Sequence, residues 1–120
     1  MESHSYHSAM SPEMQSCIAA CLDCFAKCEM CAAHCIGEAE MEACLRACLD
    51  CAKTCQTCVS LMSYGSPLHA KMCGVCADAC AACAAECEKQ AAHHDHCRIC
   101  GEACRVCEQS CRRMSGQMSA

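Results

Sequence analysis

Cysteine recurs along this chain at steps of three and four residues, and the two steps alternate strictly within four blocks. Such alternation is a heptad with the same residue at both core positions, a and d. It predicts four α-helices, each with a continuous stripe of thiols on one face. Together the four blocks hold all 21 cysteines of the chain: Cys17, Cys21, Cys24, Cys28, Cys31 and Cys35; Cys44, Cys48, Cys51, Cys55 and Cys58; Cys73, Cys76, Cys80, Cys83 and Cys87; and Cys97, Cys100, Cys104, Cys107 and Cys111.

Residues that start and end helices separate these blocks. Ser11 followed by Pro12 is typical of a helix N-terminus with the serine as N-cap, and Gly37 and Gly65 can end the first two helices. The start of the second helix is rich in glutamate, which the helix dipole favours there. We therefore predict helices over residues 12–36, 39–63, 67–92 and 95–114.

The connections between these helices are short, so successive helices are expected to run antiparallel. The predicted fold class is all-α: an antiparallel, up-down-up-down four-helix bundle with a cysteine-lined core. A length of 120 residues suits a single domain. We place the bundle at residues 11–114 and expect disordered segments at 1–10 and 115–120, where Ser, His and Met follow no period.

Composition argues against several classes of function. The net charge is −5 and the chain has two Tyr, one Phe and no Trp, so it lacks the basic and aromatic surface of a nucleic-acid-binding protein. No stretch approaches the roughly 20 apolar residues that span a bilayer. No carboxylate pair, nucleophile with a placed base or phosphate-binding loop is visible, so we do not expect an enzyme. The N-terminus lacks the pattern of a secretory signal, so we expect a cytoplasmic protein with reduced thiols.

Disulfides and redox catalysis fit the cysteine pattern poorly. Cβ atoms three or four residues apart on a helix lie about 5–6 Å from each other, whereas a disulfide needs roughly 3.5–4.5 Å. The chain has eight Cys-x-x-Cys pairs, where an oxidoreductase needs one at an exposed helix N-terminus. A core that only filled space could use Ala or Val, which pack as well and carry no risk of oxidation. The spacing instead predicts thiolates that share metal ions.

Charge favours Cu(I) among the thiophilic metals. Soft thiolates select Cu(I), Zn(II) or iron–sulfur clusters. With about one Cu(I) per bridging thiolate the core is neutral, whereas five separate Zn(II) tetrathiolate sites would leave a charge of about −10 in the interior, which is costly to bury. We therefore expect a protein that stores and sequesters multiple Cu(I) ions and so buffers copper. A metallothionein-like Zn(II) or Cd(II) buffer is the alternative.

The tandem Cys-x-x-Cys-x-x-x-Cys runs of all four helices resemble the bacterial cysteine-rich four-helix-bundle copper storage proteins, over about residues 12–114. Residues 92–97 (Ala-His-His-Asp-His-Cys) are similar to the His-rich approach to the fourth helix in that family. The resemblance implies that all 21 cysteines are Cu(I) ligands and that the bundles assemble as homotetramers. The absence of an export signal places the chain nearer the cytosolic branch. The partners expected are copper ions and the donors or acceptors of copper, with no nucleic acid and no membrane.

One further heptad step along each cysteine stripe gives a candidate layer of ligands at each end of the bundle. At the end that holds both termini, this layer consists of Met14, Met62, His69 and Met114. At the opposite end the step gives Glu38, Met41, Gln90 and His93, with His34, His94 and His96 nearby. Weak, neutral soft ligands suit a port through which copper is passed inward to thiolates, although a methionine can also act as a flexible core plug. We hypothesise that the first layer is the port, with the His-rich end and its candidate ligands Met41 and His93 as the rival.

Overall fold

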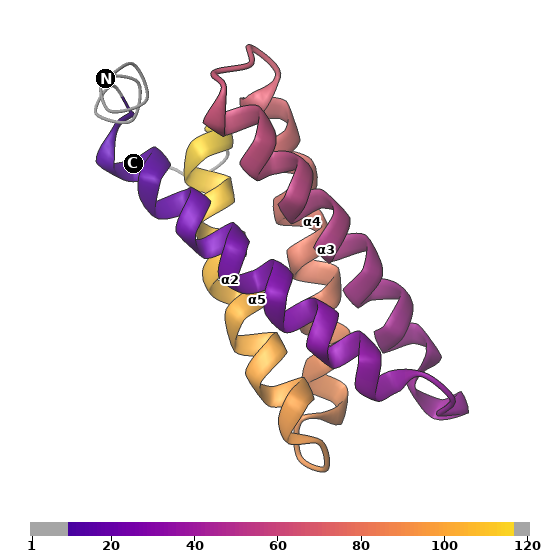
Figure 1. The fold of residues 1–120 in the computed structure, drawn as a ribbon. Coiled ribbons are helices and arrows are strands. Elements are labelled where there is room, and N and C mark those ends of the chain that lie inside the picture. Colours follow the sequence, from indigo (N-terminus) through magenta and orange to yellow (C-terminus); the bar gives the residue numbers. More distant parts are fainter. Residues whose placement is uncertain (1–9, 117–120) are drawn as a thin grey trace.

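The computed structural model describes residues 10–116, which fold into four α-helices and one short 3-10 turn (Figure 1). The elements are α2 (Pro12–Cys35), η1 (Ala39–Met41), α3 (Glu42–Ser63), α4 (His69–Gln90) and α5 (Asp95–Ser115). The described residues contain no β-strand. The predicted all-α fold class is therefore confirmed.

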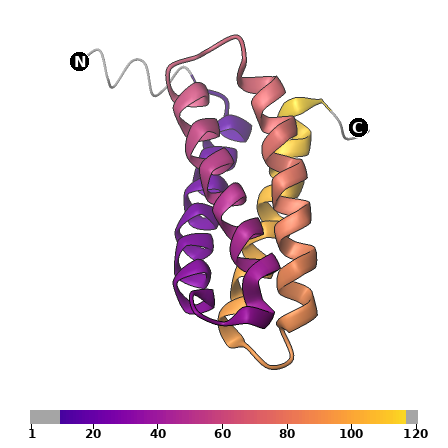
Figure 2. The ribbon, with the colours of Figure 1, turned by 90° about the vertical axis from the view of Figure 1, so that its right-hand side faces the viewer.

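The helices form an up-down-up-down bundle in which each helix packs against two others. Helix α2 contacts α3 and α5, and α4 contacts the same two helices, so the four helices surround one core (Figure 2). At the methionine end of the bundle, α2 begins, α5 ends and residues 64–68 join α3 to α4 (Figure 1). At the opposite, histidine end, residues 36–41 and 91–94 make the other two connections.

Several helix boundaries differ from the predicted ones by a turn or less. The α-helical part of the second helix starts at Glu42 rather than at residue 39, because η1 precedes it. The third helix starts at His69 rather than at residue 67, because Ser66 Oγ accepts a hydrogen bond from Leu68 N (3.1 Å) and forms a turn. The fourth helix includes Ser115, one residue beyond the predicted end, and Gly116 follows it as the C-cap in the left-handed conformation (φ 79°). Residue 10, also predicted to be disordered, is among the described residues: the carbonyl oxygen of Met10 accepts a hydrogen bond from Gln15 Nε2 (2.9 Å). The rest of the predicted disorder falls on residues 1–9 and 117–120, outside the described residues.

Thiols fill the core in place of large apolar side chains. All 21 cysteines are buried, and none has more than 2% of its surface exposed. The largest fully buried side chains of the described residues are two methionines, Met41 and Met62. Phe25, the one phenylalanine of the chain, is only half-buried. The cysteine stripe of every helix therefore faces inward, as its spacing predicts.

Small residues beside the stripes let α4 and α5 approach each other closely. Ala77 and Ala84 are buried on α4, and Gly101 is buried on α5. A Cβ atom on Gly101 would lie 3.3 Å from the Cβ of Cys87, which is tight for two carbon atoms. A glycine inside a helix costs about 1 kcal/mol relative to alanine. This close contact gives a structural reason for the glycine.

The start of α2 depends on one hydrogen bond from a side chain. Ser11 Oγ accepts it from Met14 N at 3.0 Å, which satisfies a backbone donor that has no partner within the helix. We expect Ser11→Ala to lower the free energy of unfolding of the reduced, metal-free chain by about 1 kcal/mol. Urea denaturation followed by far-UV circular dichroism would measure the change.

The matched control is Ser16→Ala, on the exposed face of the same helix. Alanine is the better helix former there, so this variant should keep its stability or gain up to about 0.5 kcal/mol. Equal losses in the two variants would contradict a specific capping role for Ser11.

Candidate metal centre

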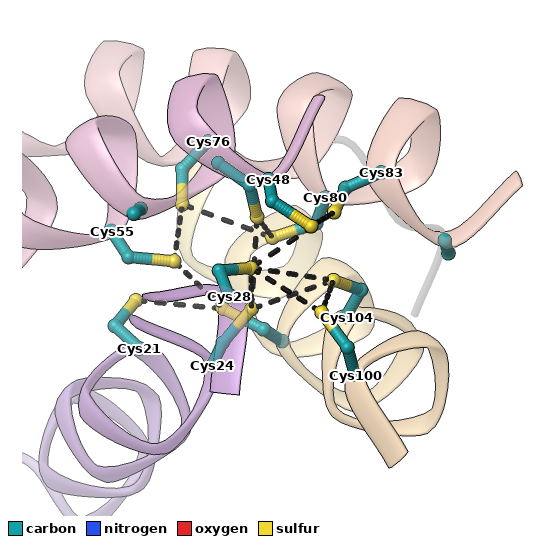
Figure 3. Close-up of a cluster of buried hydrophobic side chains, with 14 of the residues drawn as sticks. Cys21, Cys24, Cys28, Cys48, Cys55, Cys76, Cys80, Cys83, Cys100 and Cys104 are labelled. Carbon is teal, nitrogen blue, oxygen red and sulfur yellow. Dashed lines mark hydrogen bonds between the residues drawn. The ribbon is translucent and has the colours of Figure 1, made fainter. Parts of the chain in front are cut away.

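The thiols of the four helices meet along the axis of the bundle. The Sγ atom of Cys24, on α2, lies 3.9 Å from that of Cys28 on the same helix and 3.8 Å from that of Cys104 on α5 (Figure 3). It also lies 3.7 Å from the Sγ of Cys51 on α3. The Sγ of Cys51 in turn lies 3.6 Å from that of Cys80 on α4. All four helices thus contribute sulfur atoms to one connected cluster.

Groups of four thiols lie close enough together to hold one metal ion. Within each group the sulfur atoms lie within 4.8 Å of one another, and the members come from three or four helices. Five such groups are Cys21, Cys58, Cys76 and Cys111; Cys21, Cys55, Cys76 and Cys107; Cys24, Cys55, Cys80 and Cys107; Cys24, Cys28, Cys51 and Cys104; and Cys28, Cys83, Cys100 and Cys104. Consecutive groups share members, so a thiolate in one group can bridge to an ion in the next. The geometry favours a continuous chain of bridged ions over isolated sites.

A thiophilic ion fits between these sulfur atoms with little movement of the protein. Metal–thiolate bonds are roughly 2.3 Å long, so two sulfur atoms 3.6–4.0 Å apart can both bind an ion that lies off the line between them. A disulfide needs a sulfur–sulfur distance of about 2.05 Å, and all 21 cysteines are free thiols in this structure. The arrangement therefore suits metal binding better than disulfide cross-linking.

The core offers no positive side chain that could balance a thiolate. Among residues 10–116, the buried polar side chains are Ser66 and Ser110. Cationic side chains are instead found in ion pairs on the surface, such as that of Arg105 with Glu88 (2.9 Å). Burying an unbalanced charge is costly, so protons or metal ions must cancel the charge of every thiolate.

Burial disfavours the charged form of a core thiol. It raises the pKa of Cys97 to about 12 and that of Cys35 to about 11, from the ordinary value of 9.0. These thiols are therefore neutral at pH 7. Metal binding must exchange their protons for ions.

The four residues of the predicted port layer all lie at the methionine end. Met62 is buried, and its Sδ atom lies 4.0 Å from a cysteine sulfur of α4. Met14 and Met114 are half-buried and pack against the cysteine core. His69 is half-buried, and its Nδ1 donates a hydrogen bond to the carbonyl oxygen of Ser66 (2.8 Å). That hydrogen bond leaves Nε2 as the ring nitrogen able to bind a metal.

At the histidine end, the two predicted candidates differ in their surroundings. Met41 is buried, whereas His93 is exposed. The imidazole in contact with the core is that of His96, whose Nδ1 lies 3.2 Å from the Sγ of Cys31 and 3.6 Å from the Sγ of Cys97. His96 is thus placed to share a metal ion with two thiols, although it is absent from the ligand set predicted from the sequence.

The heptad position of His96 indicates that its side chain faces α2. This residue occupies position g of α5, and His34 occupies position g of α2; the g positions of adjacent antiparallel helices face each other. The two rings stack with their centroids 4.7 Å apart, and the ring of His94 lies 5.4 Å from that of His96. A cavity of about 190 Å³ lies beside them between α2 and α5. Burial lowers the pKa of His96, and His34 and His94 lower it further, which favours the neutral, metal-binding imidazole.

Comparison with known proteins gives one consistent result. The sequence model of a family described as copper storage protein matches residues 10–116. A cytosolic copper storage protein from Streptomyces lividans, solved with five coppers, is 37% identical; the match covers 89% of this chain and 95% of that one, with a TM-score of 0.82. The apo form of copper storage protein 3 from Bacillus subtilis is 39% identical, with 84% and 97% covered and a TM-score of 0.79.

A second copper-containing structure is similar to the chain to the same degree. The Cu(I)-bound copper storage protein BsCsp3 is 38% identical; the match covers 86% of this chain and 98% of that one, with a TM-score of 0.80. No curated protein is similar to the chain in sequence.

The raised thiol pKa values predict how the stability of the metal-free chain depends on pH. The native state keeps protons on Cys35 and Cys97 up to about pH 11 and 12, whereas the ordinary thiol pKa is 9.0. Between these limits the native state binds more protons than the unfolded state, so the free energy of unfolding falls as pH rises. We expect a constant contribution from these thiols below about pH 8 and a progressive loss above about pH 9.

Urea denaturation of the reduced chain at several pH values, from about pH 7 to about pH 10, would measure this loss. The Cu(I)-loaded chain is the control, because its thiolates carry no protons to lose. A metal-free chain that keeps its full stability across this range would contradict the assignment of neutral buried thiols.

Proposed function

This chain belongs to the copper storage protein family, and from that premise we propose that it stores many Cu(I) ions on the thiolates of its core. The observation that carries the proposal is the series of overlapping four-thiol groups along the bundle axis. About one Cu(I) per bridging thiolate makes the loaded core neutral, and the described part of the core has no cation of its own to do so. All 21 cysteines are the proposed ligands.

Storage then proceeds as an exchange of protons for copper. The metal-free core is neutral because its thiols are protonated, and the loaded core is neutral because each thiolate binds Cu(I). Both states exclude water from the core, and the loaded state keeps its bound ions away from oxygen. The chain thus buffers copper by binding it and needs no catalytic step. The alternative of a Zn(II) or Cd(II) buffer has no support in the family or in the solved structures described above.

The cytoplasm is the proposed location, in line with the relative from S. lividans, which is a cytosolic protein. None of the helices in the described part of the chain is both long and apolar enough to cross a membrane. Donors that deliver Cu(I) and acceptors that remove it are the partners such a store requires.

A homotetramer is the proposed assembly. The helix pair α2 and α3 offers an apolar outer surface for contact with a second copy of the chain. Leu22 on α2 and Leu49 on α3 are 52% and 46% exposed, and both occupy heptad position b. Half-buried Phe25 and Leu45 lie in the seam beside them. Assembly on this face would leave both ends of the bundle free to exchange copper.

The methionine end is the proposed port. The Sδ atom of Met62 lies 4.0 Å from the Sγ of Cys73, the first thiol of α4. Met14, His69 and Met114 occupy the same end. Thioether and imidazole ligands bind Cu(I) without a charge and resist conversion to disulfides, which suits a position outside the thiolate core. The histidine end is the rival port, since His96 contacts two thiols there.

Anaerobic titration of the reduced chain with Cu(I) tests the storage function. We expect about 14–21 Cu(I) per chain, the range set by three or two bridging thiolates for each ion. A parallel titration with Zn(II) is the control, and metal analysis after gel filtration gives the bound amounts. Saturation near about five Cu(I), together with stronger uptake of Zn(II), would contradict Cu(I) storage.

Replacement of two port residues tests the route of copper. Met62→Leu combined with Met114→Leu keeps the apolar volume and removes both thioethers, so we expect slower Cu(I) loading with nearly unchanged final capacity. Stopped-flow mixing with a coloured Cu(I) complex would measure the rate. The matched control changes His93, His94 and His96 to Ala at the opposite end. Parental rates in the methionine variant, with slow loading in the histidine variant, would move the port to the histidine end.

A further inference from the structure

One pair of thiols lies closer together than any other in the described part of the chain. The Sγ atoms of Cys58 and Cys73 are 3.2 Å apart. The other contacts between thiols lie between 3.6 and 4.0 Å, as for Cys51 with Cys80 and for Cys76 with Cys80. A disulfide requires about 2.05 Å, so this pair needs the smallest displacement to form one.

The position of this pair in the fold also favours a bond between the two sulfur atoms. Cys58 lies near the C-terminus of α3, and Cys73 lies one turn after His69, the first residue of α4. The short connection between these two helices contains Gly65 in the left-handed conformation (φ 73°). Backbone at helix ends and connections adjusts at a lower cost than backbone in the middle of a packed bundle. Pairs in the middle, such as Cys24 with Cys51, could close only by drawing whole helices together.

The reagent that can oxidise this pair is copper itself. Both thiols are fully buried, which keeps bulky oxidants away. Copper that enters at the methionine end passes these thiols, and the present inference rests on the storage function and the port proposed above. Imidazole suits the harder Cu(II) ion better than a thioether does. His69 lies one turn from Cys73 and has its Nε2 free because Nδ1 is bonded to Ser66.

We propose that the chain also accepts cupric ions and reduces the first two of them to Cu(I) with the thiols of Cys58 and Cys73. Two S–H bonds break and one S–S bond forms. Each of two Cu(II) ions takes one electron, and the two protons leave to solvent. The 21 thiols less these two leave 19 to hold the Cu(I) produced. The core thus reduces Cu(II) to Cu(I), the oxidation state that its thiolates bind.

Two equivalents of cupric sulfate added anaerobically to the reduced chain test this reaction. Electron paramagnetic resonance follows the loss of Cu(II), and alkylation after removal of Cu(I) with a chelator in acid denaturant counts the remaining thiols. Trypsin cuts after Lys53 and Lys71, so a Cys58–Cys73 disulfide joins two separate peptides, and tandem mass spectrometry locates it. We expect the Cu(II) signal to vanish, 19 thiols to remain and this disulfide to predominate.

Two double variants make the assignment specific. Cys58→Ser with Cys73→Ser should slow the reduction by roughly tenfold or more and scatter the remaining disulfides. The matched control, Cys24→Ser with Cys51→Ser, removes a central pair whose sulfur atoms are 3.7 Å apart. It should bind less Cu(I) but still place its disulfide between Cys58 and Cys73.

A persistent Cu(II) signal, a disulfide at a central pair, or parental reduction rates in the Cys58/Cys73 variant would each overturn the proposal. Anaerobic loading of the same samples with Cu(I) separates this result from failure of storage. A chain that binds Cu(I) normally but does not reduce Cu(II) at this pair retains the proposed function and loses only the further inference. A chain that binds no Cu(I) loses the proposed function itself.

Discussion

A thiolate buried in an apolar interior must have its counterion beside it, and the rest of this structure depends on that requirement. The bundle encloses 21 thiols, and the buried polar side chains of its described part are two serines. Two neutral states are then accessible: one in which every sulfur holds a proton, and one in which the sulfurs share monovalent metal ions. Intermediate states with free thiolates are costly because no arginine or lysine reaches inward. The ion pairs on the surface, such as Lys27 with Asp23, can serve solubility and helix stability without affecting the core.

The fold followed from the cysteine spacing because a strict a/d repeat leaves only one inward face on each helix. Inward faces on antiparallel helices bring together residues that are far apart in sequence. Cys17 and Cys111 lie 3.8 Å apart although 94 positions separate them, as an antiparallel arrangement of the first and last helices requires. The cysteine repeat predicts the structure less well where the period stops. The 3-10 turn before α3 and the Ser66 turn before α4 depend on local hydrogen bonds, to which a seven-residue period is insensitive.

The ends of the core show the same limit. Heptad steps placed Met14, Met62 and Met114 at one end because these residues lie within helices, where the phase still holds. Helix α5 begins only at Asp95, so its phase does not yet apply at His93, which is exposed in the preceding connection. Contact between His96 and the thiols depends on how the g positions of α2 and α5 pack, which is a property of the helix pair. The a and d positions of each helix, considered separately, do not predict this contact.

The overlap between neighbouring thiol groups has a kinetic consequence. Cys28 belongs to a group with Cys51 and also to a group with Cys83, and Cys104 belongs to both. An ion held by one group can therefore exchange its sulfur ligands one at a time and reach the next group without ever becoming a free ion. Repeated along the axis, such ligand exchange would let copper ions move through the core from one thiol group to the next. Ions nearest the port would be the last to bind and the first to be released. Copper would therefore leave the core in the reverse order of its binding, and not from independent sites.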